Sequence, residues 1–364
     1  MGKTDPWSMD DLHGEFERMV AKACKDADLP PEEVEAVINR TIVRSSKGAA
    51  KVLLKELRAR APAMLRGRRA DRKGFEARNF KRWRKAFDLL EMIMAIAYEA
   101  SDAFARHFHA EADADDDTVF QALVAIHARC LLVASEVLCL MGGGYADGAI
   151  ARWRTLYELN VVALFIRDHG PIIAARYLVH ADVQAAKAAR AWNAAAKAGD
   201  FEPHDPAAIA MLESRAVEIK AIFGDEMENQ YGWASPALNG AKKPNFRQIE
   251  DGVDMGHWRG VYQWACAHNH GGHHPSEDLL GQSERDHPLL LAGASNSGMT
   301  SPLALVAASL THVTSTLLFT RLNLDRLVAA RVLMKLSQEI GPVARKAEAK
   351  SLAKFHKSLS VALG

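Results

Sequence analysis

The chain has 364 residues, of which 49% are hydrophobic and 25% charged, and its formal net charge is +1. These values are ordinary for a soluble globular protein and leave room for one large domain or two smaller ones. The four cysteines include no CxxC pair, which argues against a disulfide framework and a thiolate zinc site and favours a cytoplasmic location.

The elements predicted along the chain are helices throughout. Apolar residues recur at i, i+3, i+4 and i+7 in nearly every long window, and alternating strand patterns with hairpin turns are missing. A Gly-containing basic loop follows the second helix, and a Gly/Pro/Asn-rich connection covers about 224–254. The sequence therefore predicts an all-α, multi-helix bundle. The expected helices cover about 9–27, 31–61, 75–110, 117–141, 145–168, 171–198, 206–223, 255–268, 302–322, 324–339 and 342–362.

An acidic linker near 112–117 separates two regions of different charge. It divides a basic helical N-terminal region, 1–112, from a larger all-α domain, 117–364. The N-terminus lacks the apolar stretch of a secretory signal. The most apolar run, 302–319, contains five hydroxyl side chains and a histidine, so we expect a buried core helix there and no membrane partner.

The N-terminal region concentrates positive charge. Between Arg40 and Lys85 it holds seventeen Lys and Arg against three Asp and Glu. Arg82 and its basic neighbours are interleaved with Phe80 and Trp83, which suits phosphate contact with base stacking. We therefore expect 40–85 to bind nucleic acid, RNA in the first instance. A solvated face, pairing with the acidic remainder, and a membrane or protein partner are the alternatives. Six residues spaced by three or four form one stripe on a helix: Arg40, Arg44, Lys47, Lys51, Lys55 and Arg58.

A second candidate site lies in the run "YADGAIARWRTLYELNVVALFIRD". Arg154 and Glu158 are i, i+4 neighbours in a segment otherwise fit for a core, so their charged groups can meet. A partly buried charge needs a partner, which favours a groove along this helix. Arg154 would bind an anion, with Glu158 orienting it or acting as a general base. The alternative is a structural ion pair.

The histidine-rich stretch "WACAHNHGGHHPSED" is the third candidate site. For acid/base chemistry without metal, His268 or His270 at the end of a helix would be suited, because a helix C-terminus favours imidazolium. For a metal site, His270, His273 and His274 would converge across the Gly-Gly pair, with Asp278 adding oxygen. A polar capping loop is the third interpretation, and no cofactor is expected.

Two of these segments resemble a bacterial family numbered 5677 among the domains of unknown function, over about 120–325. The match rests on a small-residue turn followed by "RTLYE", and later on "YGWA" and "YQWACAHNHGG". The resemblance implies an α-helical domain. The positions that it carries over are Arg154, Tyr157, Glu158, Tyr262 and His270, and we expect Tyr157 and Tyr262 among them to bind substrate.

The chain is also similar, more distantly, to HEPN-type helical ribonucleases and abortive-infection proteins. That similarity implies cleavage of RNA by an Arg and a His without metal, often across a homodimer. The pairs Arg176–His180 and Arg285–His287 depart from the usual spacing, so Arg154 and His270 would have to meet through the fold. We expect a nucleic-acid-acting effector, such as a metal-independent ribonuclease in bacterial defence. A non-catalytic nucleic-acid-binding or ligand-sensing regulator and a metal-dependent hydrolase are the alternatives.

Overall fold

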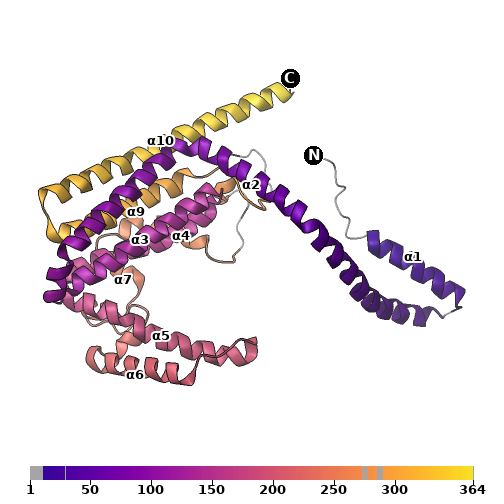
Figure 1. Cartoon of the computed structure of the whole chain (residues 1–364), viewed down its shortest axis with the longest axis horizontal. Coiled ribbons are helices and arrows are strands. Elements are labelled where there is room, and N and C mark those ends of the chain that lie inside the picture. The colour runs from indigo at the N-terminus through magenta and orange to yellow at the C-terminus, as the bar shows by residue number, and fades with distance from the viewer. Residues whose placement is uncertain (1–10, 29, 273–274, 276–277, 285–289, 364) are drawn as a thin grey trace. The chain divides into compact units, whose positions relative to one another are not determined.

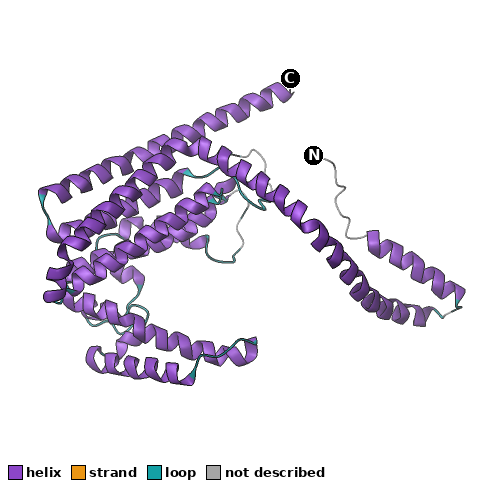
Figure 2. Ribbon diagram, viewed as in Figure 1, coloured by secondary structure: helices purple, strands orange, loops and turns teal. Residues whose placement is uncertain are grey.

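The computed structural model describes residues 11–28, 30–272, 275, 278–284 and 290–363. Every regular element in these ranges is a helix, which confirms the all-α prediction (Figure 2). Residue contacts divide the chain into two compact units, Met1–Phe75 and Glu76–Gly364. The predicted change of region at 112–117 coincides with the turn between α2 and α3, inside the second unit.

The first unit contains α1 (Asp11–Asp26) and the first half of α2, which spans Pro31–Ala114. The prediction of a loop between two helices is wrong here, because α2 continues through Pro62 and Gly67. Proline in a helix removes one hydrogen bond and strains one turn. The Arg-, Leu- and Ala-rich sequence on both sides has high helix propensity, which outweighs that local cost. The long helix α10 (Leu324–Leu363) likewise continues through Pro342, where two helices were expected.

The second unit is built around α4 (Ala146–His169). Every residue from 159 to 166 is buried, because this part of the helix is apolar on all sides except at Asn160 and has neighbours all around it. It packs against α3 (Thr118–Gly142) and α9 (Thr300–Leu318), and α9 packs in turn along α10 (Figure 1). The second half of α2 joins this core through Trp83, Phe87 and Leu90, which are at most 1% exposed.

The connection between α4 and α9 forms a second layer on the core. Helix α5 (Pro171–Gly199) packs along α6 (Pro206–Phe223) (Figure 1). Farther along the chain, in the described part of this connection, short 3-10 helices precede and follow α7 and α8. The buried Arg176 of α5 fixes this connection by donating hydrogen bonds to the carbonyls of Phe223, Gly232 and Trp233. The short elements are η1 (Asp225–Glu228), η2 (Gly232–Leu238), α7 (Phe246–Asp251), η3 (Gly256–Trp258), α8 (Arg259–Ala267) and η5 (Leu280–Gln282).

Within the described ranges, two helices are long and apolar enough to cross a membrane by length and composition alone. They are Thr118–Gly142 and Thr300–Arg321. The second is mostly buried inside the second unit, as core helices of soluble proteins are. The two helices also contact each other through the buried His127 and Thr314. Packing within the unit therefore accounts for most of the apolar window of Thr300–Arg321, 67% of which is buried, and for less of that of Thr118–Gly142, 39% of which is buried.

Candidate functional site

Arg154 and Glu158 lie where α4 meets α8. Arg154 Nη2 is 2.8 Å from Glu158 Oε1, so the predicted i, i+4 pair forms. From α8, Tyr262 donates its hydroxyl to Glu158 at 2.5 Å and accepts from Arg154 Nη2 at 2.9 Å. Arg154 Nε points to Cys266 Sγ at 3.1 Å. The Arg154 and Glu158 side chains keep 32% and 22% of their surface exposed, so the cluster is open to solvent on one side.

One part of Arg154 is left for a ligand. Its Nε and Nη2 groups are engaged, while Nη1 has no partner among the residues that the structure describes. A guanidinium carries five N–H donors in a rigid fork, so the two donors on Nη1 remain for an anion. The ring of Tyr262 lies under the guanidinium, 5.2 Å from its carbon, and holds it in place.

A second ion pair lies behind the first. Glu250 of α7 is fully buried and accepts hydrogen bonds from Tyr157 Oη at 2.7 Å and Arg259 Nη1 at 3.0 Å. Tyr157 is 1% exposed, and its ring packs 5.5 Å from that of Tyr262. Tyr157, predicted to touch substrate, instead anchors the 246–255 segment to α4. Its hydroxyl is used by Glu250, so it contributes support for the site and not a free polar group.

Burial and the carboxylate of Glu158 keep Tyr262, and the nearby Tyr231 that precedes η2, protonated. Desolvation, together with the hydrogen bond to Glu158 and its negative charge, raises the pKa of Tyr262 well above its ordinary value. Desolvation and the charge of Glu158 raise the pKa of Tyr231 to about 12, against the opposing effect of Arg154. At neutral pH both phenols are therefore hydrogen-bond donors, and neither is a base.

The histidine stretch begins at the end of α8. His268 caps that helix, its side chain is 5% exposed, and Nδ1 lies 3.5 Å from Asp147 Oδ1. Asp147 stands in the first turn of α4 and also accepts hydrogen bonds from the backbone amides of Leu280 and Gly281. Asp147 and Arg154 are seven residues apart, about 10 Å of helical rise. His268 and Arg154 therefore both lie where α4 packs against α8. We call this contact, formed by Asp147, Arg154, Glu158, Tyr262 and His268, the α4–α8 seam.

His270 lies apart from this seam. It is exposed in the turn after α8, and no contact joins it to Arg154 in the described part of the chain. For a metal, no group of three His, Cys, Asp or Glu side chains lies close enough among the described residues. His273 and His274 of the predicted metal set lie outside the described residues, as do Arg285 and His287, while Asp278 is exposed.

The basic region splits into an exposed part and a buried part. All six stripe residues are exposed on α2: Arg40, Arg44, Lys47, Lys51, Lys55 and Arg58. Arg82, by contrast, forms an ion pair with Glu284, and its side chain is 12% exposed. Trp83 is 1% exposed and donates to the Asn296 carbonyl, so base stacking on it is ruled out in this fold. Helical periodicity explains the error, because residues 82 and 83 face the core once α2 enters the second unit.

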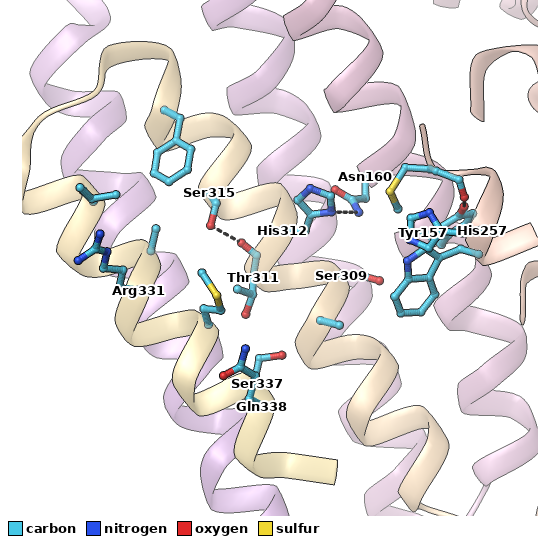
Figure 3. A pocket seen from close by; sticks show the side chains of 17 residues that line it. Tyr157, Asn160, His257, Ser309, Thr311, His312, Ser315, Arg331, Ser337 and Gln338 are labelled. Carbon is cyan, nitrogen blue, oxygen red and sulfur yellow. Dashed lines mark hydrogen bonds between the residues drawn. The ribbon is translucent and has the colours of Figure 1, made fainter. Parts of the chain in front are cut away.

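A cavity adjoining this site escaped the sequence analysis. It occupies about 590 Å³ between α4, α9, α10 and the 255–258 turn (Figure 3). Asn160 and His312 lie on its wall and are joined by a hydrogen bond of 3.2 Å. Both are polar residues inside apolar runs, which was the available signal. The sequence alone gave no reason to pair positions 152 residues apart.

The central part of the chain matches one protein-family model. Residues 120–288 match the model of a family of unknown function, DUF5677. Curated proteins and solved structures yielded no match. The matched segment contains α4, α8 and both ion pairs, and it ends before α9 and α10, short of the expected limit near 325. Residues 120–288 are therefore similar to the DUF5677 family, the resemblance that the Arg154–Glu158 and Tyr262–His270 motifs predicted.

Proposed function

We propose that the protein binds nucleic acid, RNA in the first instance, through the basic stripe of α2. The observation that carries this proposal is the exposure of all six stripe residues along one helix. Like charges three and four residues apart repel each other and destabilise an isolated helix. A polyanion lying along the stripe would remove that repulsion and release counterions, which favours binding.

Intramolecular pairing accounts for little of this charge. Of the six stripe residues, only Arg40 makes a side-chain hydrogen bond among the described residues, to the Ala36 carbonyl of its own helix. Near the stripe, Arg60 pairs with Glu56, and both side chains are more than half exposed. Such exposed pairs contribute little to stability. The stripe is therefore available to an external partner.

The proposal is tested by electrophoretic mobility shift with a single-stranded RNA across a salt series. The variant Lys47→Gln/Lys51→Gln/Lys55→Gln removes three charges from the stripe. Six phosphate contacts give a slope of log K against log salt of about −4, and the variant lowers its magnitude by about 2. Equal slopes for the variant and the unaltered protein would contradict the proposal. The control variant removes three exposed lysines of the second unit: Lys242→Gln, Lys243→Gln and Lys335→Gln.

A second candidate function is cleavage of the bound RNA without metal. It is favoured by the α4–α8 seam, where the open Nη1 of Arg154 and the Asp147 partner of His268 both belong to α4. Arg154 would hold the scissile phosphate, and His268 would move a proton with Asp147 orienting its ring. His270 is less suited to this role than its motif predicted, because it lies off the seam. The HEPN-like relationship, a defence setting, a homodimer and a cytoplasmic location belong with this candidate as further proposals.

Cleavage is tested by incubating RNA with the protein in excess EDTA. The Arg154→Gln and His268→Gln variants should each lose cleavage while keeping the salt-dependent RNA shift. His270→Gln is the matched control, since it changes a neighbouring imidazole outside the seam, and it should retain cleavage. Intact RNA with the unaltered protein, at concentrations where the RNA is fully shifted, would eliminate this candidate and leave the binding proposal standing.

A further inference from the structure

The 590 Å³ cavity between α4, α9 and α10 has the size of a small-molecule site (Figure 3). It lies wholly in the second unit and is separate from the Arg154 cluster, which it touches only through Tyr157. Much of its wall is apolar. The main apolar contributors are Met255, Trp258, Phe319, Leu327 and Met334. A ligand filling this space would therefore need an apolar body.

The polar part of the wall offers hydrogen-bond donors. Asn160 Nδ2 donates to His312 Nδ1, and a neutral imidazole that accepts on Nδ1 carries its proton on Nε2. Desolvation, with the nearby charge of Arg167, lowers the pKa of His312 and keeps it neutral. Nε2–H has no protein partner in the described part of the chain. Asn160, 1% exposed, thus fixes the tautomer in which His312 is a donor.

The cavity wall carries positive charge and no negative charge. Its lining residues include Arg331 of α10, and no Asp or Glu. Arg331 is exposed and has no ion-pair partner among the residues that the structure describes, although α10 contains several acids. An unpaired guanidinium beside apolar surface suits a carboxylate, which it can bind through two parallel hydrogen bonds.

We propose that this cavity binds a small monocarboxylate with an apolar, ring-sized body, whose carboxylate is held by the exposed Arg331 at one side of the cavity. The Nε2–H of His312, on the α4 side, is a separate donor for a polar atom elsewhere on the ligand. The body would pack on Trp258, Phe319 and Met334. This site is independent of the nucleic-acid proposal, because none of its polar contacts involves the α2 stripe or Arg154. It corresponds to the ligand-sensing alternative, with a stated class of ligand.

The test uses 2-naphthoate as the probe and 2-naphthamide as a neutral molecule of the same shape, titrated by calorimetry and ligand fluorescence. The unaltered protein should bind the carboxylate more tightly. Arg331→Gln should weaken naphthoate by about fivefold to tenfold, since a partly solvated charged hydrogen bond is lost, and leave naphthamide unchanged. Arg331→Lys should restore part of the difference. Circular dichroism melts confirm that each variant folds.

Filling the cavity separates this site from non-specific binding. Ala308→Phe projects a ring into the space and should abolish binding of both probes. Ser337→Trp, near the α10 side of the cavity, serves if Ala308→Phe does not fold. Equal affinity for the two probes, no response to Arg331→Gln, or binding that survives a folded blocking variant would overturn the proposal. The proposal would also be overturned if the protein were a dimer in solution whose interface covers the cavity opening and prevents naphthoate from binding.

Discussion

His127 predicts how the stability of the second unit depends on pH. This side chain is 1% exposed on α3, and its Nε2 lies 2.9 Å from Thr314 Oγ1 of α9. Thr314 donates its own hydroxyl to the Leu310 carbonyl, so it must accept from His127. The imidazole is therefore neutral with its proton on Nε2. A second proton would place a charge in the apolar interior, and desolvation accordingly lowers the pKa of His127 to about 4.

The magnitude follows from linkage between folding and proton binding. Between the reference pKa of 6.5 and about 4, the unfolded chain binds the proton and the native one does not. Stability is thus fully present above pH 6.5 and decreases as pH falls through 4. The whole effect is about 3 kcal/mol, of which about 2 kcal/mol is lost by pH 5.

The assay is urea unfolding of the protein and of His127→Gln at pH 7.5 and pH 5. Glutamine keeps a donor for Thr314 and does not titrate, so the variant should lose about 2 kcal/mol less than the unaltered protein over this range. His109→Gln, at an exposed position, is the control and should leave the difference unchanged. Identical pH dependence for His127→Gln and the unaltered protein would show that His127 is charged or solvated in the native state.

Two further predictions concern buried ionic groups. Arg176→Met should destabilise the protein by about 3–5 kcal/mol and increase proteolysis of the 223–233 connection, because three backbone carbonyls and a carboxylate lose their donor. Arg259→Met should cost about 2–3 kcal/mol, less than a fully buried pair since Arg259 is 31% exposed, as it leaves Glu250 with one donor. Adding Glu250→Gln should recover part of that loss in a thermal melt, and an additive double variant would refute the coupling.

The spacing of apolar residues along the sequence predicted most of the helices. The apolar period located α3, α4, α5, α6, α8 and α9 within a few residues, because long apolar faces pack into the core. It missed α7 and the 3-10 helices η1 and η2, which are too short for a helical period and lie in the expected connection at 224–254. The helix ends predicted near Pro62 and Pro342 were wrong, because α2 and α10 continue through these prolines. The prediction gave full weight to the proline and ignored the high helix propensity of the residues on both sides. Helix length depends on that sum, and a single residue does not decide it.

The candidate site was predicted in part. The Arg154–Glu158 pair follows from i, i+4 spacing, and Tyr262 was carried by the family motif. His268 and Asp147 are 121 positions apart, and Asp147 gave no signal because an acid in a first helical turn is expected for capping alone. Trp83, by contrast, was wrongly predicted to be exposed and available for base stacking. The basic residues around Trp83 suggested an exposed ring. Its side chain is buried because this face of α2 packs against the core, which the local sequence does not reveal.

Asp147 also closes a chain segment on itself. His268 and the backbone amides of Leu280 and Gly281 all meet this one carboxylate, so both ends of the stretch between them are tied to the first turn of α4. Doubling the length of a closed loop costs only about 0.6 kcal/mol. The Gly271-Gly272 pair, exposed and with open space at both Cβ positions, is therefore a point where a peptide tag or reporter can be inserted without disturbing the helical framework.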